Sequence, residues 1–361
     1  MIKERRDFFA DYRVKLIIII TLFFVISIVG VTNYVKAEEK NNFQKYWPSP
    51  SQAKIEFVRS ISNAQQLQPK KKKGLFGKFT DFIFGKKEKN IRFKRPFGLS
   101  SLGENLYVAD PAAQAVYKID FAEERMEEFL YESEGGFFSG GEGFFATPID
   151  VIAIKDKIFV SDSTQEEVLV FSKEGKLLKK LGSEEMKRPT GLGIARDKQQ
   201  LYISDTVGNK IYIYDTESYE LIDSFANRGG KQGELNYPVD ICVRDNKVYV
   251  SDSMNFRVQI FDLNGNFISE FGQLGDGSGD FARSKGVAVD SDGNIYVVDA
   301  LFGVVQIFNE QGKLLLTFGK EGSKPGQFWL PTGIYIDQDD DIYVADSYNH
   351  RIQVFKYLGE E

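Results

Sequence analysis

Six near-copies of a five-residue motif, such as IYVAD at 342–346, recur along the 361-residue chain. They constrain its fold more than any other feature. Each copy alternates aliphatic or aromatic residues with small ones and has the β-branched bias of a strand. The closing aspartates lie 52, 43, 47, 47 and 47 residues apart, and they are Asp110, Asp162, Asp205, Asp252, Asp299 and Asp346. A period in this range indicates repeated units that bury their apolar faces against one another.

Each repeat is predicted to contain four antiparallel strands. An inner strand precedes the motif, a polar loop and a third strand follow it, and a turn such as Asn264-Gly265 leads to a fourth. The sequence therefore predicts an all-β fold, a six-bladed β-propeller over residues 93–361. Too few residues follow Phe355 to form a fourth strand in the last blade. We expect residues 54–61 to complete that blade and close the ring, which also removes an exposed strand edge.

The loops after two of the aspartates resemble NHL repeats. They read DSMNFR at 252–257 and DSYNHR at 346–351. The resemblance covers roughly residues 93–357 and implies a six-bladed propeller of the bacterial exported, membrane-associated type. Such a fold does not by itself determine an activity. We expect each aspartate to accept hydrogen bonds from the backbone N–H groups that follow it. The arginines are expected to pair with the aspartate of a neighbouring blade.

The N-terminal segment 1–37 predicts export. Basic residues precede a predominantly apolar run without charges at 16–31, and Val35-Lys36-Ala37 resembles a signal-peptide cleavage site. The length of the run suits either an uncleaved transmembrane anchor or a cleaved signal peptide. In both cases we expect the propeller to lie outside the cytoplasm, either anchored to the cytoplasmic membrane or secreted. Residues 38–53 are expected to form a linker.

Charge separates an insert at 62–92 from the propeller. Residues 70–95 carry eleven Lys and Arg against two acidic residues, whereas residues 96–361 carry 25 against 44. Apolar spacing predicts a short amphipathic helix over 70–87, which suits an anionic membrane or a partner; the alternative is that its apolar stripe docks on the propeller. Its contact residues are Lys70, Lys71, Lys72, Lys73, Leu75, Phe76, Phe79, Phe82 and Ile83. The acidic propeller argues against a nucleic-acid partner.

Little in the sequence supports catalysis or a cofactor. His350 is the only histidine, so a histidine-ligated zinc cannot be built, and no nucleophile motif accompanies it. Asp150 and Asp240 are weak candidates for a Ca²⁺ site in the central channel, because they stand in inner strands where other blades have glycine. Asp276 and Asp280 are weak candidates in a loop. We expect no cofactor, with Ca²⁺ as the alternative.

The long Gly-rich connections between blades are predicted to share one face with the loops that follow the second strands, and loops on a rigid scaffold are where binding usually resides. We therefore predict a monomeric propeller that acts as a protein-interaction or sensor scaffold for an unidentified protein. The alternative is a Ca²⁺-dependent hydrolase or lyase that uses the channel. Candidate partner contacts in the longest connection are Tyr131, Phe137, Phe138 and Phe144.

Overall fold

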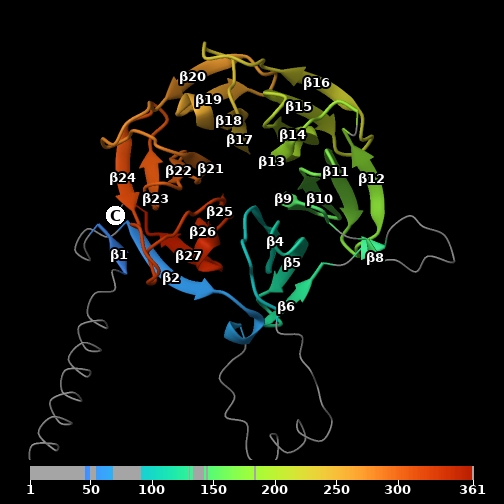
Figure 1. Ribbon diagram of the computed structural model, residues 1–361, viewed down its shortest axis with the longest axis horizontal. Coiled ribbons are helices and arrows are strands. Elements are labelled where there is room, and N and C mark those ends of the chain that lie inside the picture. The colour runs from blue at the N-terminus through green and yellow to red at the C-terminus, as the bar shows by residue number, and fades with distance from the viewer. Residues whose placement is uncertain are drawn as a thin grey trace, which may run out of the picture. The chain divides into compact units, whose positions relative to one another are not determined.

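The computed structural model describes residues 45–48, 54–67, 91–129, 131–132, 142–143, 145–182 and 184–359. Contacts divide the chain into Met1–Gln44 and Lys45–Glu361, and all the described residues belong to the second unit. This unit is a six-bladed β-propeller, with the blades arranged around a central axis (Figure 1). The predicted all-β propeller is thereby confirmed.

The first three blades are regular four-stranded antiparallel sheets. Blade one contains β3 (Leu99–Leu102), β4 (Asn105–Asp110), β5 (Ala115–Asp120) and β6 (Arg125–Glu128). Blade two contains β9 (Pro148–Ile154), β10 (Lys157–Asp162), β11 (Glu167–Ser172) and β12 (Leu177–Leu181). Blade three contains β13 (Pro189–Ala195), β14 (Gln200–Asp205), β15 (Lys210–Asp215) and β16 (Leu221–Phe225). A small hairpin of β7 (Tyr131–Glu132) and β8 (Glu142–Gly143) lies in the connection between blades one and two.

The next two blades repeat the pattern, and the last draws strands from both ends of the unit. Blade four contains β17 (Pro238–Arg244), β18 (Lys247–Asp252), β19 (Arg257–Asp262) and β20 (Phe267–Phe271). Blade five contains β21 (Ser284–Val289), β22 (Ile295–Asp299), β23 (Val304–Phe308) and β24 (Leu314–Phe318). Blade six contains β25 (Ile334–Ile336), β26 (Asp341–Asp346), β27 (Arg351–Tyr357), β2 (Ile55–Ile61) and β1 (Tyr46–Trp47).

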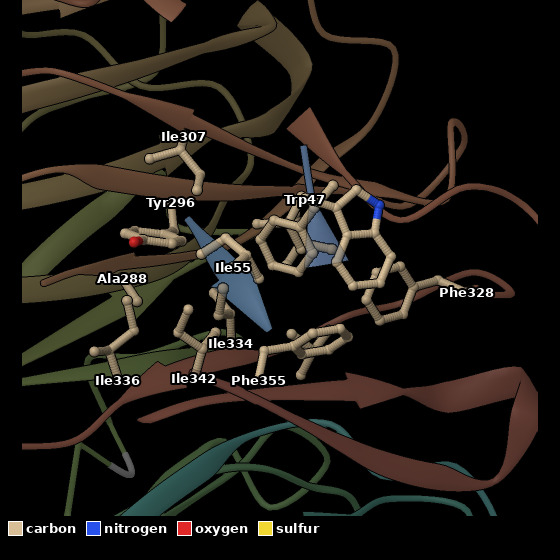
Figure 2. Packing of buried hydrophobic residues seen from close by; sticks show 14 of the residues in the cluster. Trp47, Ile55, Ala288, Tyr296, Ile307, Phe328, Ile334, Ile336, Ile342 and Phe355 are labelled. Atoms are coloured by element: carbon tan, nitrogen blue, oxygen red, sulfur yellow. The ribbon is translucent and has the colours of Figure 1, made fainter. Parts of the chain in front are cut away.

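Ring closure follows the predicted pairing, with one addition. Strand β2 pairs antiparallel with β27, so Ile55 lies opposite Tyr357. Residues of the expected linker 38–53 add a short fifth strand, β1, which pairs with β2. The reason is apolar burial. Trp47 is 6% exposed and packs its ring 5.8 Å from that of Phe355, within the cluster shown in Figure 2.

Each blade begins with an apolar residue that fills the space between neighbouring sheets. This residue stands three positions before the turn into the inner strand, and each one is buried: Phe93, Phe145, Met186, Leu235, Phe281 and Phe328. These six residues therefore act as plugs between the blades. Their burial, with that of alternate strand residues, gives six clusters distributed around the ring instead of one central core.

Side-chain hydroxyl groups join blades two, three, four and six to the blade that follows, at the start of its inner strand. Thr206 Oγ1 donates to the carbonyl of Pro238 at 2.7 Å, and Ser253 Oγ donates to that of Ser284 at 2.9 Å. Ser347 closes the circle by donating to Pro96 of blade one. These bonds fix the relative positions of the inner strands and therefore the shape of the channel that the strands surround.

Helical structure in the described part of the chain is limited to short 3-10 turns. They are η2 (Ala64–Gln66), η3 (Arg196–Lys198), η4 (Ser253–Asn255) and η5 (Ser347–Asn349). Among these residues, no helix has the length and hydropathy needed to cross a membrane. The predicted export segment 1–37 and the predicted helix over 70–87 lie outside the described residues.

Candidate functional site

One face of the propeller carries the blade-to-blade connections together with the loops that follow the second strands; we call it the rim face. Backbone hydrogen bonds join the two kinds of loop. Met254 N–H donates to Asn236 O at 3.0 Å, and Tyr348 N–H donates to Trp329 O at 3.2 Å. The rim face is therefore a continuous surface in which each connection lies against the loop of the blade that it enters.

Three Gly-rich connections, 226–237, 272–283 and 319–330, are held in the same way by a buried glutamine from the third strand of the blade that follows. Gly233 N–H donates to Gln259 Oε1 at 2.9 Å, and Gln259 Nε2 donates back to Glu234 O at 2.6 Å. Gln306 and Gln353 make the equivalent pairs of bonds with their own connections. Each connection leads into a strand and not a helix, so none of the three has the geometry of a phosphate-binding loop.

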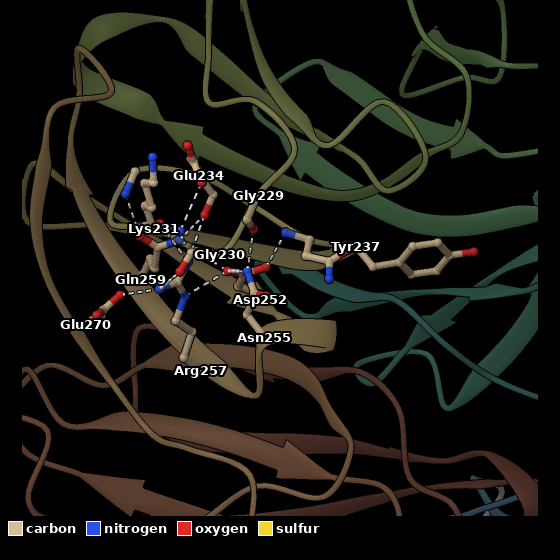
Figure 3. Close-up of polar contacts among 12 residues, drawn as sticks. Gly229, Gly230, Lys231, Glu234, Tyr237, Asp252, Asn255, Arg257, Gln259 and Glu270 are labelled. Carbon is tan, nitrogen blue, oxygen red and sulfur yellow. Dashed lines mark hydrogen bonds and ion pairs between the residues drawn. The ribbon is translucent and has the colours of Figure 1, made fainter.

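The arginine of the NHL-like loop is a structural clamp (Figure 3). Arg257 Nε pairs with Asp252 Oδ2 at 2.9 Å, and its other nitrogens bond to Gly230 O, Lys231 O and Glu234 O. The expectation that such an arginine reaches a neighbouring blade's aspartate is wrong. Strands β18 and β19 form a hairpin whose register places Arg257 directly opposite Asp252 of the same repeat.

The aspartates that close the second strands also hold the connections. Asp110 Oδ2 accepts from Lys94 N–H at 2.6 Å, and Asp205 Oδ1 accepts from Arg188 N–H at 2.9 Å. These donors precede the aspartate by 16 and 17 residues, so the predicted bonds from the following loop describe only part of the arrangement. Since all six aspartates are fully buried in this structural role, they are not free to act on a ligand.

Exposed apolar side chains gather on the rim face. Six large ones stand on its loops and connections, at exposures of 38–66%: Val207, Tyr237, Met254, Leu274, Leu301 and Trp329. We call this set the apolar rim. The Trp329 and Tyr348 rings are in tilted contact at 5.6 Å between centroids, and the guanidinium of Arg95 lies 4.8 Å from the centre of the Tyr348 ring. Exposed aromatic and Met side chains on loops that the scaffold holds rigidly are typical of binding surfaces.

A channel of about 510 Å³ runs along the propeller axis and is lined by the inner strands of all six blades. Asp150 and Asp240 both line it. Burial and the nearby charge of Asp240 raise the pKa of Asp150 well above its ordinary value. Burial raises the pKa of Asp240 to about 7. The channel thus contains two carboxyl groups that are protonated more readily than usual.

The channel carboxyls do not fit a Ca²⁺ site. Asp150 accepts Val151 N–H at Oδ1 and Leu192 N–H at Oδ2, both at 2.8 Å, and Asp240 Oδ2 accepts Val287 N–H at 2.9 Å. Ca²⁺ requires six to eight oxygen ligands. Within the described residues, no three His, Cys, Asp or Glu side chains converge in a metal-binding arrangement.

The loop candidates are also accounted for. Asp280 accepts Gln273 Nε2 at 2.9 Å and Gly277 N–H at 3.1 Å, which folds its own connection, while Asp276 is exposed. The two candidates therefore do not form a joint cation site.

The predicted aromatic contacts and the basic insert remain predictions. Only the backbone of Tyr131 is described, paired with Gly143 in the β7–β8 hairpin, while Phe137, Phe138 and Phe144 lie outside the described residues. So do the predicted contacts from Lys70 to Ile83. The apolar rim was not predicted from the sequence. Its signal was one or two apolar residues in otherwise polar loops, such as Met254 in DSMNFR.

Comparisons with known sequences agree with the architecture. A sequence model of the NHL repeat matches residues 328–355, and one described as a 6-bladed beta-propeller matches residues 145–226 and 231–305. RING finger protein nhl-1 of Caenorhabditis elegans is 42% identical over 65 residues, which are 18% of this chain and 7% of that protein. The chain spans 7% to 24% of the length of three curated relatives that it matches.

Solved structures with a similar fold differ in function. An auxiliary nutrient binding protein from Bacteroides thetaiotaomicron VPI-5482 has a TM-score of 0.55 and 16% identity, covering 74% of this chain and 70% of that one. Virginiamycin B lyase from Staphylococcus aureus has a TM-score of 0.54 and 12% identity, covering 84% and 100%. At these identities the likeness establishes the fold alone, because one fold carries many functions.

Proposed function

Since this chain is a six-bladed β-propeller that carries an NHL repeat, we propose that it is a binding scaffold whose rim face engages a protein partner. The observation that carries the proposal is the apolar rim, because solvent-exposed aromatic and aliphatic side chains are common at the centre of protein interfaces. The clamps from Gln259 and Arg257 support it. They hold the connections in one conformation, so little entropy is lost when a partner binds.

The proposed location is outside the cytoplasm, at the cytoplasmic membrane. Its support is the basic flank and apolar run of residues 1–37, with the basic insert 62–92 as a second contact for membrane or partner. A scaffold held there would present the rim face to another exported or membrane protein. In a sensor role the rim face would bind a partner in the same way, and that partner would transmit the signal.

The alternative of a Ca²⁺-dependent hydrolase or lyase in the channel has less support. The oxygens of the channel carboxyls are engaged by backbone N–H groups that join neighbouring blades. His350, the only histidine of the chain, lies in a rim loop, with Nδ1 bonded to the backbone carbonyl of Lys94. No observation therefore favours catalysis over binding.

The experiment that tests the proposal compares two matched triple variants of the full chain in co-purification from its native membrane. One variant changes Met254, Leu301 and Trp329 of the apolar rim to Glu. The control changes three equally exposed residues of outer strands to Glu: Leu221, Ile268 and Leu315. We expect a stoichiometric partner with the wild type and the outer-strand variant, and its loss from the rim variant. Loss from both variants or from neither would contradict the proposal.

A further inference from the structure

Four basic residues stand where the connections of blades one, three and five enter the inner strands, at the rim-face end of the channel. Arg95, Arg188 and Arg283 occupy equivalent positions in blades one, three and five, directly before the turn into the inner strand. Lys285, two residues after Arg283, is half-buried and lines the channel itself. We call these four residues the cationic mouth. They stand on alternate blades, and Arg188 and Arg283 lie near enough to Lys285 for their charges to act on it.

Within the part of the chain that the structure describes, no salt bridge holds the cationic mouth, although the carboxyl group of Asp240 lies near Lys285. Among the described residues, no carboxylate forms an ion pair with any of its four members. Arg188 Nη1 donates to the hydroxyl of Tyr237 at 3.1 Å, and Arg95 lies over the Tyr348 ring, so both contacts are with aromatic side chains. Arg257 differs, because its charge is neutralised by the ion pair with Asp252. The mouth therefore presents guanidinium groups that are available to an external anion.

Two arginines of the mouth repel its lysine, although the propeller as a whole is acidic. Burial, and then the charges of Arg283 and Arg188, lower the pKa of Lys285 to about 8, while Asp240 acts in the opposite direction. The charged form of Lys285 is thus destabilised by burial and by two neighbouring arginines. An anion at the mouth would relieve that repulsion, and the low-dielectric walls of the channel would strengthen the attraction.

We propose that the cationic mouth is an anion-binding site that takes clustered carboxylates, supplied by an acidic segment of the partner protein. This rests on the proposed function and specifies the chemistry of its partner. The planar guanidinium group of an arginine can donate two parallel hydrogen bonds to one carboxylate. The acidic body of the propeller, with 25 basic against 44 acidic residues over 96–361, repels an extended polyanion. A short acidic segment avoids that repulsion, because it need touch only the mouth.

The apolar rim adds a second requirement to this segment. Tyr237 is both a member of the apolar rim and the partner of Arg188, so the two surfaces are continuous. Trp329 is joined to Arg95 through Tyr348 in the same way. A segment that fits both surfaces carries aromatic or aliphatic residues beside its acidic ones.

The test is isothermal titration calorimetry of the full chain with the peptide Trp-Glu-Glu-Glu-Trp, its Gln-substituted analogue and citrate. We expect the Glu peptide to bind and the Gln peptide not to bind. R188Q/R283Q should weaken the Glu peptide by at least roughly tenfold, because charge-assisted hydrogen bonds are lost. The matched control K173Q/K176Q removes the same charge from an exposed turn on the opposite face and should change affinity by less than about twofold.

Three results would overturn the proposal: no binding of the Glu peptide, equal binding of the Gln peptide, or equal weakening by the two double variants. Tighter binding of citrate than of the peptide would assign the site to a free small anion and contradict the protein source. Co-purification distinguishes failure of the anion-site proposal from failure of the proposed function. If R188Q/R283Q retains the partner, the anion site fails and the scaffold proposal stands. If the peptide binds but no partner is found, the scaffold proposal fails.

Discussion

Asp150 of blade two accepts a hydrogen bond at Oδ2 from the backbone N–H of Leu192 in blade three, at 2.8 Å. Asp240 makes the same bond to Val287 between blades four and five, at 2.9 Å. Between blades one and two the backbone bonds directly, from Gly98 N–H to Ile149 O. The two aspartates therefore join inner strands that the backbone alone does not join. Their location in the channel serves the assembly of the ring.

The Asp240 carboxyl makes stability depend on pH. Its pKa is raised to about 7 in the folded protein, so between about pH 4 and 7 the folded state holds a proton that the unfolded chain has lost. The free energy of unfolding therefore falls as pH rises through this window. Asp240→Asn keeps an acceptor for Val287 but cannot ionise. We expect urea denaturation to show the variant gaining about 2–4 kcal/mol relative to wild type between pH 4 and 8.

A gain that is constant across this pH range would contradict the assignment to Asp240. The control is Asp156→Asn, in the exposed turn between β9 and β10, which should track the wild type at every pH.

Arg257 is predicted to stabilise both its blade and the rim face. Arg257→Ala leaves Asp252 buried without its cation, which should cost roughly 3–5 kcal/mol in urea denaturation. Hydrogen exchange at the Gly233 amide should accelerate, because the connection loses three carbonyl contacts. Arg257→Lys should recover only part of the loss, since a single ammonium cannot reach all of these partners. Unchanged exchange at Gly233 in the Ala variant would contradict the clamp.

Ring closure should depend on the buried side of β2. Ile55 is fully buried, and Ile55→Ala should lower the free energy of unfolding by about 2–5 kcal/mol. Val58 on the same strand is 49% exposed, so Val58→Ala should change it by less than about 0.5 kcal/mol. Calorimetric melting of the two variants measures both values. Equal effects would mean that β2 does not close the ring through its apolar face.

Lys285 is expected to oppose stability while serving binding. Because burial and two arginines disfavour its charge, Lys285→Met should raise the free energy of unfolding at pH 7 by about 1–2 kcal/mol. Wild-type stability should also rise with pH from about 8 toward 10.5, where the unfolded chain binds the proton more tightly. A melting scan across pH checks both effects. Destabilisation by Met at pH 7 would show that the ammonium is a structural group.

The repeat period predicted the fold because each blade copies the same alternation of buried and exposed residues. Even the closing strand was predictable, since residues 54–61 carry that alternation and blade six lacked a partner. The short strand at Tyr46–Trp47 was not predicted. Two residues carry no periodicity, and their place depends on the distant aromatic cluster around Phe355.

The candidate site was harder to predict from the sequence than the fold. The sequence indicated the loop-rich face as a whole, but it could not show that Arg188, Arg283 and Lys285 lie close together around one axis. They come from blades three and five, and their mutual effect exists only in the folded ring. The clamp by Arg257 was assigned to the wrong blade for a similar reason, since loop spacing does not reveal cross-strand register.

The most direct test of the scaffold proposal is site-specific photo-crosslinking of the full-length chain in living cells. A photoreactive residue is placed at Met254 of the apolar rim or at Ile268 of an outer strand, which are similarly exposed at 54% and 48%. We expect one discrete protein adduct from position 254 and none from position 268. Absence of an adduct at 254, or the same adduct at both positions, would contradict a binding face on the rim.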